Sequence, residues 1–114
     1  MQVNDFLNKL KDQAESISFD DTMAVIDANY HFTPSAFRNG ETQNAAEQNN
    51  GSCKVFAFAQ LNKLTEEETL QCFGDYYRKD VLQNPQGDDH QNIRNFIKSG
   101  WAGIAFEGSP LTAR

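Results

Sequence analysis

The most apolar run of the chain is Gly51-Ser52-Cys53-Lys54-Val55-Phe56-Ala57-Phe58-Ala59-Gln60-Leu61, and polar segments lie on both sides of it. A strand is one interpretation of this run, but no polar face alternates with the apolar one. A helix that is apolar nearly all round is typical of a helix enclosed by other elements. Asn50 or Ser52 could supply an N-cap oxygen, and Lys63 suits the C-terminal end of the helix dipole. We therefore expect a central helix here.

The composition is that of one small acidic domain. The 114 residues carry a net charge of -6, and the part up to Asn50 holds most of it, with three Lys or Arg against eight Asp or Glu. We expect a single domain over residues 1–114. An acidic surface repels phosphate backbones, so no nucleic-acid partner is expected. Because neither a bilayer-length apolar run nor a secretory leader is visible, no membrane association is expected either.

Cys53 and Cys72 are the only cysteines. Two are too few for a disulfide framework, and they lack zinc-site spacing. We expect reduced thiols in a cytoplasmic protein, with a Cys53–Cys72 disulfide as the alternative. Other metal-ligating residue types are present without a spacing that would position them: His31, His90, Asp88 and Asp89. The sequence therefore predicts no metal and no cofactor.

Two amphipathic segments precede the polar loops. The apolar stripe of residues 4–16 predicts a first helix. Ser18 is expected to cap a second helix, with Asp21 in the capping-box position. The two helices should form an αα-hairpin.

Two further helices are expected after the central one. Thr65 opens a capping box, and its helix should run to about Leu82 with Gly74 inside it. A glycine there costs about 1 kcal/mol relative to alanine, and close approach of another backbone would explain it. Asp88 or Asp89 should cap the last helix, whose apolar face is made of Ile93, Phe96 and Ile97.

The remaining segments predict a small sheet. Phe32–Arg38 contains Pro34, which disfavours a helix at the preceding residue. We expect this segment to pair as a strand with Trp101–Phe106. Glu41–Asn50 is rich in amides and reads as a loop, and the last residues are expected to fray. The fold class is therefore α+β and mainly helical. It should contain about five helices around a central apolar helix, with a small two-stranded antiparallel sheet.

The order of the motifs resembles one known family. The motifs are Tyr30-His31-Phe32-Thr33-Pro34, Phe37-Arg38-Asn39-Gly40, Asn50-Gly51-Ser52-Cys53-Lys54, Thr69-Leu70-Gln71-Cys72-Phe73-Gly74, Tyr76-Tyr77-Arg78-Lys79-Asp80-Val81, Asp89-His90-Gln91-Asn92-Ile93-Arg94 and Gly100-Trp101-Ala102-Gly103-Ile104-Ala105-Phe106. Together they resemble the HopJ type III effector family of small bacterial proteins, from about Val3 to Leu111.

This resemblance implies a bacterial protein without an assigned activity or catalytic residues. The family name implies delivery into a host cell by type III secretion. Effectors of that kind usually begin with a Ser-rich unstructured arm, whereas a helix is expected here from about Asp5. A resident cytoplasmic role is therefore expected beside the secreted one.

A thiol site is one chemical hypothesis. Cys53 in the first turn of a helix would have its thiolate favoured by the dipole. His90 or His31 would act as base, with Asp89 or Asn39 orienting it, in a thiol-dependent hydrolase or transferase. The alternative is that Cys53 is a small buried hydrophobe.

The hypothesis that we favour is a non-enzymatic domain that binds a protein partner or a small ligand. Its candidate residues are polar or amphipathic and lie near predicted element ends. An arginine among them could grip a carboxylate in two-pronged fashion, while the alternative for all of them is an internal polar network. They are His31, Asn39, Asn50, Ser52, Cys53, Tyr77, Arg78, His90, Arg94 and Trp101, with Asn44, Tyr76 and Asn92 beside them.

Overall fold

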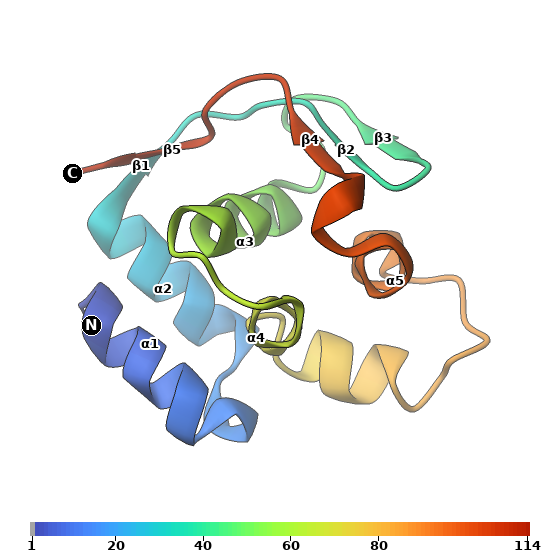
Figure 1. Cartoon of the computed structure of the whole chain (residues 1–114), viewed down its shortest axis with the longest axis horizontal. Helices are drawn as coiled ribbons and strands as arrows, with labels where there is room; N and C mark the ends of the chain where they lie inside the picture. The colour runs from blue at the N-terminus through green and yellow to red at the C-terminus, as the bar shows by residue number, and fades with distance from the viewer. Residues whose placement is uncertain (1) are drawn as a thin grey trace.

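The computed structural model describes residues 2–114 and confirms the mainly helical α+β class. The helix α3 (Asn50–Leu61) lies in the middle of the molecule, with the other helices on one side of it and short strands on the other (Figure 1). The surrounding helices are α1 (Val3–Asp12), α2 (Phe19–Asn29), α4 (Glu66–Gln71) and α5 (Gln91–Ser99). No helix among residues 2–114 is long and apolar enough to cross a membrane.

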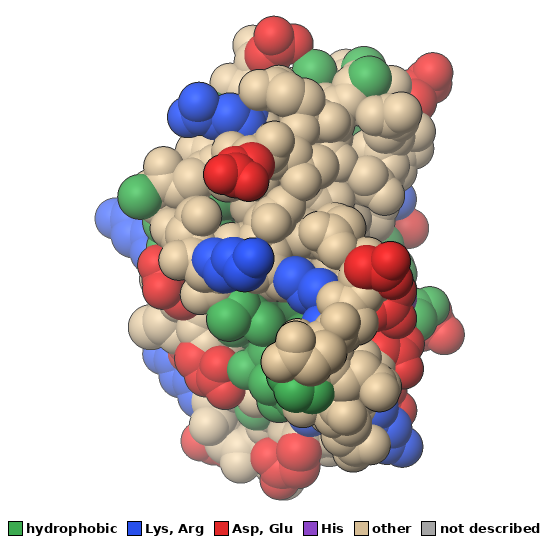
Figure 2. Space-filling model, turned by 90° about the vertical axis from the view of Figure 1, so that its right-hand side faces the viewer, with side chains coloured by type: hydrophobic (Ala, Val, Ile, Leu, Met, Phe, Trp, Pro, Cys, Tyr) green, Lys and Arg blue, Asp and Glu red, His purple; other side chains and the backbone are tan. Residues whose placement is uncertain are grey.

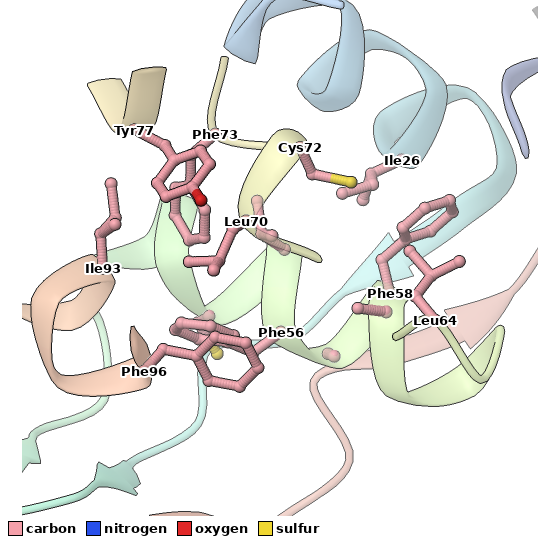
Figure 3. Close-up of a cluster of buried hydrophobic side chains, with 14 of the residues drawn as sticks. Ile26, Phe56, Phe58, Leu64, Leu70, Cys72, Phe73, Tyr77, Ile93 and Phe96 are labelled. Carbon is pink, nitrogen blue, oxygen red and sulfur yellow. The ribbon is translucent and has the colours of Figure 1, made fainter. Parts of the chain in front are cut away.

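The central position of α3 follows from its apolar surface. Val55, Phe56, Phe58 and Ala59 are all fully buried. The ring of Phe56 packs on that of Phe96 of α5 at 5.0 Å between centroids and 41° between ring planes, and this tilted pair is visible in Figure 3. Burying a phenylalanine contributes about 1.5–3 kcal/mol through the hydrophobic effect, so the enclosed helix is a major source of stability.

The predicted αα-hairpin is present, with one difference in its first helix. The helix α1 ends at Asp12, and a separate 3-10 turn, η1 (Ala14–Ser16), follows it. The predicted capping box of α2 is confirmed, since Ser18 Oγ accepts from Asp21 N at 3.0 Å and Asp21 Oδ2 accepts from Ser18 N. The turn between the two helices is therefore tight.

The segment expected to form one helix up to Leu82 is broken at Gly74. The Thr65 capping box is confirmed, but α4 ends at Gln71, and a π-helix, η2 (Tyr76–Val81), follows. Gly74 has φ +61°, and a Cβ there would lie 2.6 Å from the backbone N of Phe19. The close backbone approach considered from the sequence is thus the reason for the glycine.

The strands form more pairs than the single one expected. The predicted pairing is confirmed, with β2 (Phe37–Asn39) antiparallel to β4 (Ile104–Phe106). The strand β3 (Thr42–Asn44) extends this sheet from a segment that was expected to be a loop. A separate antiparallel pair joins β1 (Tyr30–Phe32) to β5 (Leu111–Ala113), so the last residues are not frayed.

Two helix starts and one strand differ from the expectations. The N-cap of α3 is Asn49 instead of Asn50 or Ser52, and the N-cap of α5 is His90 instead of Asp88 or Asp89. Both N-cap residues have a left-handed backbone conformation. Gly100 follows the end of α5 and opens a 3-10 turn, η3 (Gly100–Gly103), where the strand Trp101–Phe106 was expected to begin. A left-handed residue reverses the chain in one step, so both helices begin abruptly after their loops.

Candidate functional site

A cleft of about 550 Å³ lies where the N-terminal ends of α2, α3 and α5 meet the π-helix η2. It is bounded by Phe19 of α2, Tyr76 of η2 and the first turns of α3 and α5. The residues that line it are Phe19, Thr42, Asn49, Gly51, Ser52, Phe73, Tyr76, His90, Gln91, Asn92 and Ile93. We call it the aromatic cleft, because rings form its wall.

The ring of Phe19 is placed in this wall by two glycines. A Cβ on Gly51 would lie 2.7 Å from Phe19 Cζ, and a Cβ on Gly74 would collide with the Phe19 backbone. The Phe19 ring packs edge-to-face on Tyr76 at 5.2 Å and stacks with Phe73 at 6.3 Å. Ring pairs of this kind contribute about 0.5–1.5 kcal/mol beyond their burial, so the wall is held in one arrangement.

His90 continues the wall and brings a polar edge into it. Its ring lies 5.1 Å from that of Tyr76. Its Nε2 lies 3.0 Å from Asp80 Oδ2 and 3.8 Å from Asp89 Oδ2. Because Asp80 belongs to η2 and His90 is the N-cap of α5, this contact joins the two elements on that side of the cleft.

An asparagine cluster holds the two helix starts against the sheet. Asn44 Oδ1 accepts from Asn49 Nδ2 at 2.7 Å and from Asn92 Nδ2 at 3.1 Å. Asn92 Oδ1 accepts in turn from Asn44 Nδ2 and from Asn39 Nδ2. A carboxamide both donates and accepts, so these amides can pair with one another inside the protein. Within the described residues, Asn39 Oδ1 is the exception, since it is buried without a hydrogen-bond partner.

Two of the ten predicted site residues line the aromatic cleft, one supports it from behind and the other seven lie elsewhere. Ser52 and His90 line it, and Asn39 holds Asn92 behind it. Asn50 is exposed in the first turn of α3 but does not line the cleft, and exposed His31 lies on β1, opposite Thr112. The remaining five hold the fold together: Cys53, Tyr77, Arg78, Arg94 and Trp101.

The guanidinium groups of both candidate arginines donate hydrogen bonds to carbonyls and side chains of this chain. Arg78 donates to Gln71 Oε1 at 2.7 Å and to the carbonyls of Ala14 and Ile17, which fixes η1. Arg94 donates to Asp89 Oδ1 at 2.5 Å and to the carbonyl of Asn84 at 2.8 Å.

The charge of Arg94 also acts on its carboxylate partner. The hydrogen bond from Arg94 lowers the pKa of Asp89. A guanidinium that is already paired with a carboxylate and several carbonyls is not available to grip a ligand carboxylate.

The two aromatic candidates are also structural. Trp101 Nε1 donates to the carbonyl of Leu64 at 3.2 Å, and its ring packs edge-to-face on Phe96. Tyr77 donates its hydroxyl to Glu67 Oε2 at 3.1 Å, and burial together with this carboxylate raises the pKa of Tyr77 to about 12. Neither residue reaches the aromatic cleft.

The alternative hypothesis of a thiol site at Cys53 is not supported by the surroundings of its side chain. Cys53 is 1% exposed, and its Sγ lies 3.8 Å from the carbonyl of Ser35. Burial raises the pKa of the Cys53 thiol, although it occupies the helix turn whose dipole was expected to lower it. Desolvation of the thiolate outweighs the dipole because the side chain points into the core.

We expect neither thiol to react in the folded protein. Cys72 is also free and fully buried, and burial beside Glu68 raises its pKa to about 12. Iodoacetamide at neutral pH should leave both thiols unmodified and should label both after unfolding in urea, as read by intact mass. Cys72→Ser provides the background for Cys53. Native labelling of Cys53 at the rate of a free thiol would contradict this and revive the hydrolase hypothesis.

The sequence reasoning missed the ring that forms the wall of the cleft. Phe19 lies at the start of an amphipathic helix, and nothing local in the sequence distinguishes a core ring from a cleft wall. Asn49 carried a weak signal, since Asn adopts the left-handed conformation more readily than most residues. Among residues 2–114, no group of three His, Cys, Asp or Glu could hold a metal ion.

The fold is that of a small α+β protein with an enclosed apolar helix, and an aromatic-walled cleft lies at the start of that helix. Comparison with known proteins then places the chain in a family. It belongs to the HopJ type III effector protein family, whose profile matches residues 3–111. A crystal structure of an unknown-function protein, VPA0580, is 59% identical over 100% of this chain and 95% of that chain, with a TM-score of 0.99. A search of curated proteins found no match.

Proposed function

We propose that this HopJ domain is a non-enzymatic domain that binds a small ligand in the aromatic cleft. The observation that carries the proposal is the wall of Phe19, Phe73 and Tyr76 along a cleft of about 550 Å³. Ligand sites are typically clefts of about 300–1,000 Å³ with mostly apolar walls and a few polar groups. This cleft combines both features.

The lining defines the chemistry of the ligand. A flat ring can stack on Tyr76, which is 44% exposed. Hydroxyls of Thr42 and Ser52 and the imidazole of His90 lie around the same space and offer hydrogen bonds. The ligand that fits is a small molecule with one planar apolar ring and polar substituents.

A fragment screen tests this proposal. A library of small heteroaromatic molecules, followed by amide chemical shifts of the 15N-labelled protein, should give shifts confined to Gly51, Ser52, Tyr76 and Gln91. Tyr76→Ala should weaken the selected fragments about fivefold, because a ring–ring contact contributes about 1 kcal/mol.

The matched control is Leu61→Ala. Leu61 is a large residue that is 56% exposed and does not line the cleft, so its loss should leave fragment binding unchanged. No fragment binding in this cleft, or binding indifferent to Tyr76→Ala, would refute the proposal.

Where the domain acts is a separate question. We propose a cytoplasmic bacterial domain, and the family name supports type III delivery as a second candidate. A reporter fused after Ser18 and expressed in a strain with a type III apparatus discriminates between the two. Export that depends on the apparatus would favour the effector role, and retention would favour the resident role.

A further inference from the structure

Two large apolar residues are exposed near one another on the surface, Ile97 on α5 and Leu82 just after η2. Ile97 was expected in the buried face of α5, but it is 47% exposed, and Leu82, just after η2, is 53% exposed. Together with Val81 and Pro85 they line a groove of about 300 Å³. We call these four residues the Leu82–Ile97 patch.

Basic side chains border this patch. Arg94 and Lys98 of α5 line the same groove, and no acidic side chain does. Figure 2 shows apolar side chains gathered on this side of the molecule, with basic side chains directly above them and acidic side chains beside and below them. Of these two cations, Arg94 is compensated by Asp89, so the positive charge at the groove comes from Lys98.

Lys98 is the cation that remains available to a partner. Arg94 is already paired with Asp89. Lys98 is exposed and forms no ion pair with any residue of the described range 2–114. A carboxylate approaching the patch would therefore find an unpaired ammonium group next to apolar surface.

The shape of the groove favours a helical partner. Arg94, Ile97 and Lys98 stand at i, i+3 and i+4 on α5, so they form one ridge along the groove. Val81 and Leu82 form the opposite bank. Grooves between two helical segments commonly take an amphipathic helix whose apolar residues recur at the same spacing.

We propose that the Leu82–Ile97 patch docks an acidic amphipathic helix of a partner protein. One bulky aliphatic or aromatic side chain of that helix enters between Leu82 and Ile97. An Asp or Glu one helical turn away pairs with Lys98. The patch borders the aromatic cleft at Gln91, which lines both, but its apolar residues belong to the patch alone.

A phage-displayed library of single-helix peptides tests the proposal on the full chain. Binders are selected on the wild-type protein, and those that also bind Ile97→Gln are removed. The expected consensus is a bulky apolar residue with an Asp or Glu three or four positions away. A fluorescein-labelled consensus peptide should lose at least about tenfold in affinity on Ile97→Gln or Leu82→Gln, because buried anchors dominate such interfaces.

Charge reversal provides a second variant that leaves the apolar residues intact. Lys98→Glu should weaken the acidic peptide by about fivefold, with a larger effect at low salt, and should bind a Lys-substituted peptide better. Leu61→Gln, a change at an exposed leucine outside the groove, should alter nothing. Circular dichroism melting of each variant verifies that it is folded.

Three outcomes would overturn the proposal. The first is the absence of a consensus, and the second is a consensus without an acidic residue whose binding ignores Lys98→Glu. The third is a wild-type dimer in sedimentation velocity that Ile97→Gln dissociates, because a second copy would then occupy the patch. Tyr76→Ala, which weakens ligands of the aromatic cleft, should leave the peptide affinity unchanged, so the two proposals fail separately.

Discussion

Gly74→Ala is expected to lower the free energy of unfolding by about 3 kcal/mol. An alanine at φ +61° is strained, and its Cβ would lie 2.6 Å from Phe19 N and 3.0 Å from Ser18 C. Both of these atoms are backbone, so the start of α2 or the α4–η2 junction must move. Chemical denaturation followed by circular dichroism measures the loss.

Gly40→Ala separates the cost of the left-handed backbone conformation from the cost of the Cβ collision at Gly74. Gly40 has nearly the same φ, +60°, but the nearest atom to its added Cβ is the side-chain Oγ of Ser99, at 3.1 Å. The variant should therefore lose only the conformational cost, about 1 kcal/mol. Equal losses at Gly74 and Gly40 would show that contact with Phe19 does not contribute.

The comparison of Gly74→Ala with Gly40→Ala also tests the aromatic cleft. Movement of the Phe19 backbone would displace its ring from the aromatic cleft, since the ring also fills the space left by Gly51. We expect Gly74→Ala to weaken cleft-binding fragments even at temperatures where the variant is fully folded. Gly40→Ala should bind them as the wild type does.

Phe56→Ala is expected to cost about 4 kcal/mol. Phe56 is fully buried, and its ring lies 5.0 Å from Phe96, 5.5 Å from Phe73 and 6.2 Å from Phe37. These rings come from α5, the α4–η2 junction and β2, so one truncation opens a cavity where several elements meet (Figure 3). Urea unfolding monitored by circular dichroism measures the change.

Leu61→Ala is the control on the same helix. Leu61 is the last residue of α3 and is 56% exposed, so its truncation should change the free energy of unfolding by less than about 0.5 kcal/mol. A loss at Phe56 no larger than that at Leu61 would mean that α3 is not the centre of the core.

Strong local signals predicted much of the fold. The Ser18 and Thr65 capping boxes each depend on side chains three residues apart, so they form wherever those residues occur. The apolar run around Phe56 predicted an enclosed helix because every face of that helix is apolar and would be unfavourable in water. The β2–β4 pairing was predictable because few other extended segments were available as partners.

Errors arose where a distant segment decided the local structure. The apolar residues around Gly74 recur at helical spacing, which predicts one continuous helix. The helix is interrupted there because the Gly74 backbone lies against Ser18 and Phe19. The strand β3 has a polar sequence without strand character, and it forms because β2 offers backbone partners. The last residues pair with β1 for the same reason.

The candidate site was harder to predict than the fold. Arg78 and Arg94 have the chemistry of ligand-binding residues, but their donors are occupied within the chain. Arg78 donates to the distant carbonyl of Ala14, and Arg94 donates to the nearer carbonyl of Asn84. Cys53 lies in a helix turn that favours a thiolate, yet the direction of its side chain places it in the core. Residue type and spacing predict what a side chain could do, whereas its neighbours decide whether it is free to do so.

The sequence by itself determined the α+β class, the enclosed helix, two capping boxes and one strand pair, because these depend on periodicity and on neighbours a few residues away. The tertiary structure alone decided the aromatic cleft and the Leu82–Ile97 patch. Phe19, Ser52, Tyr76 and His90 belong to four separate elements, and no local pattern encodes their meeting. Ile97 has the spacing of a buried residue, and it is exposed because no other element of the described chain covers that face of α5.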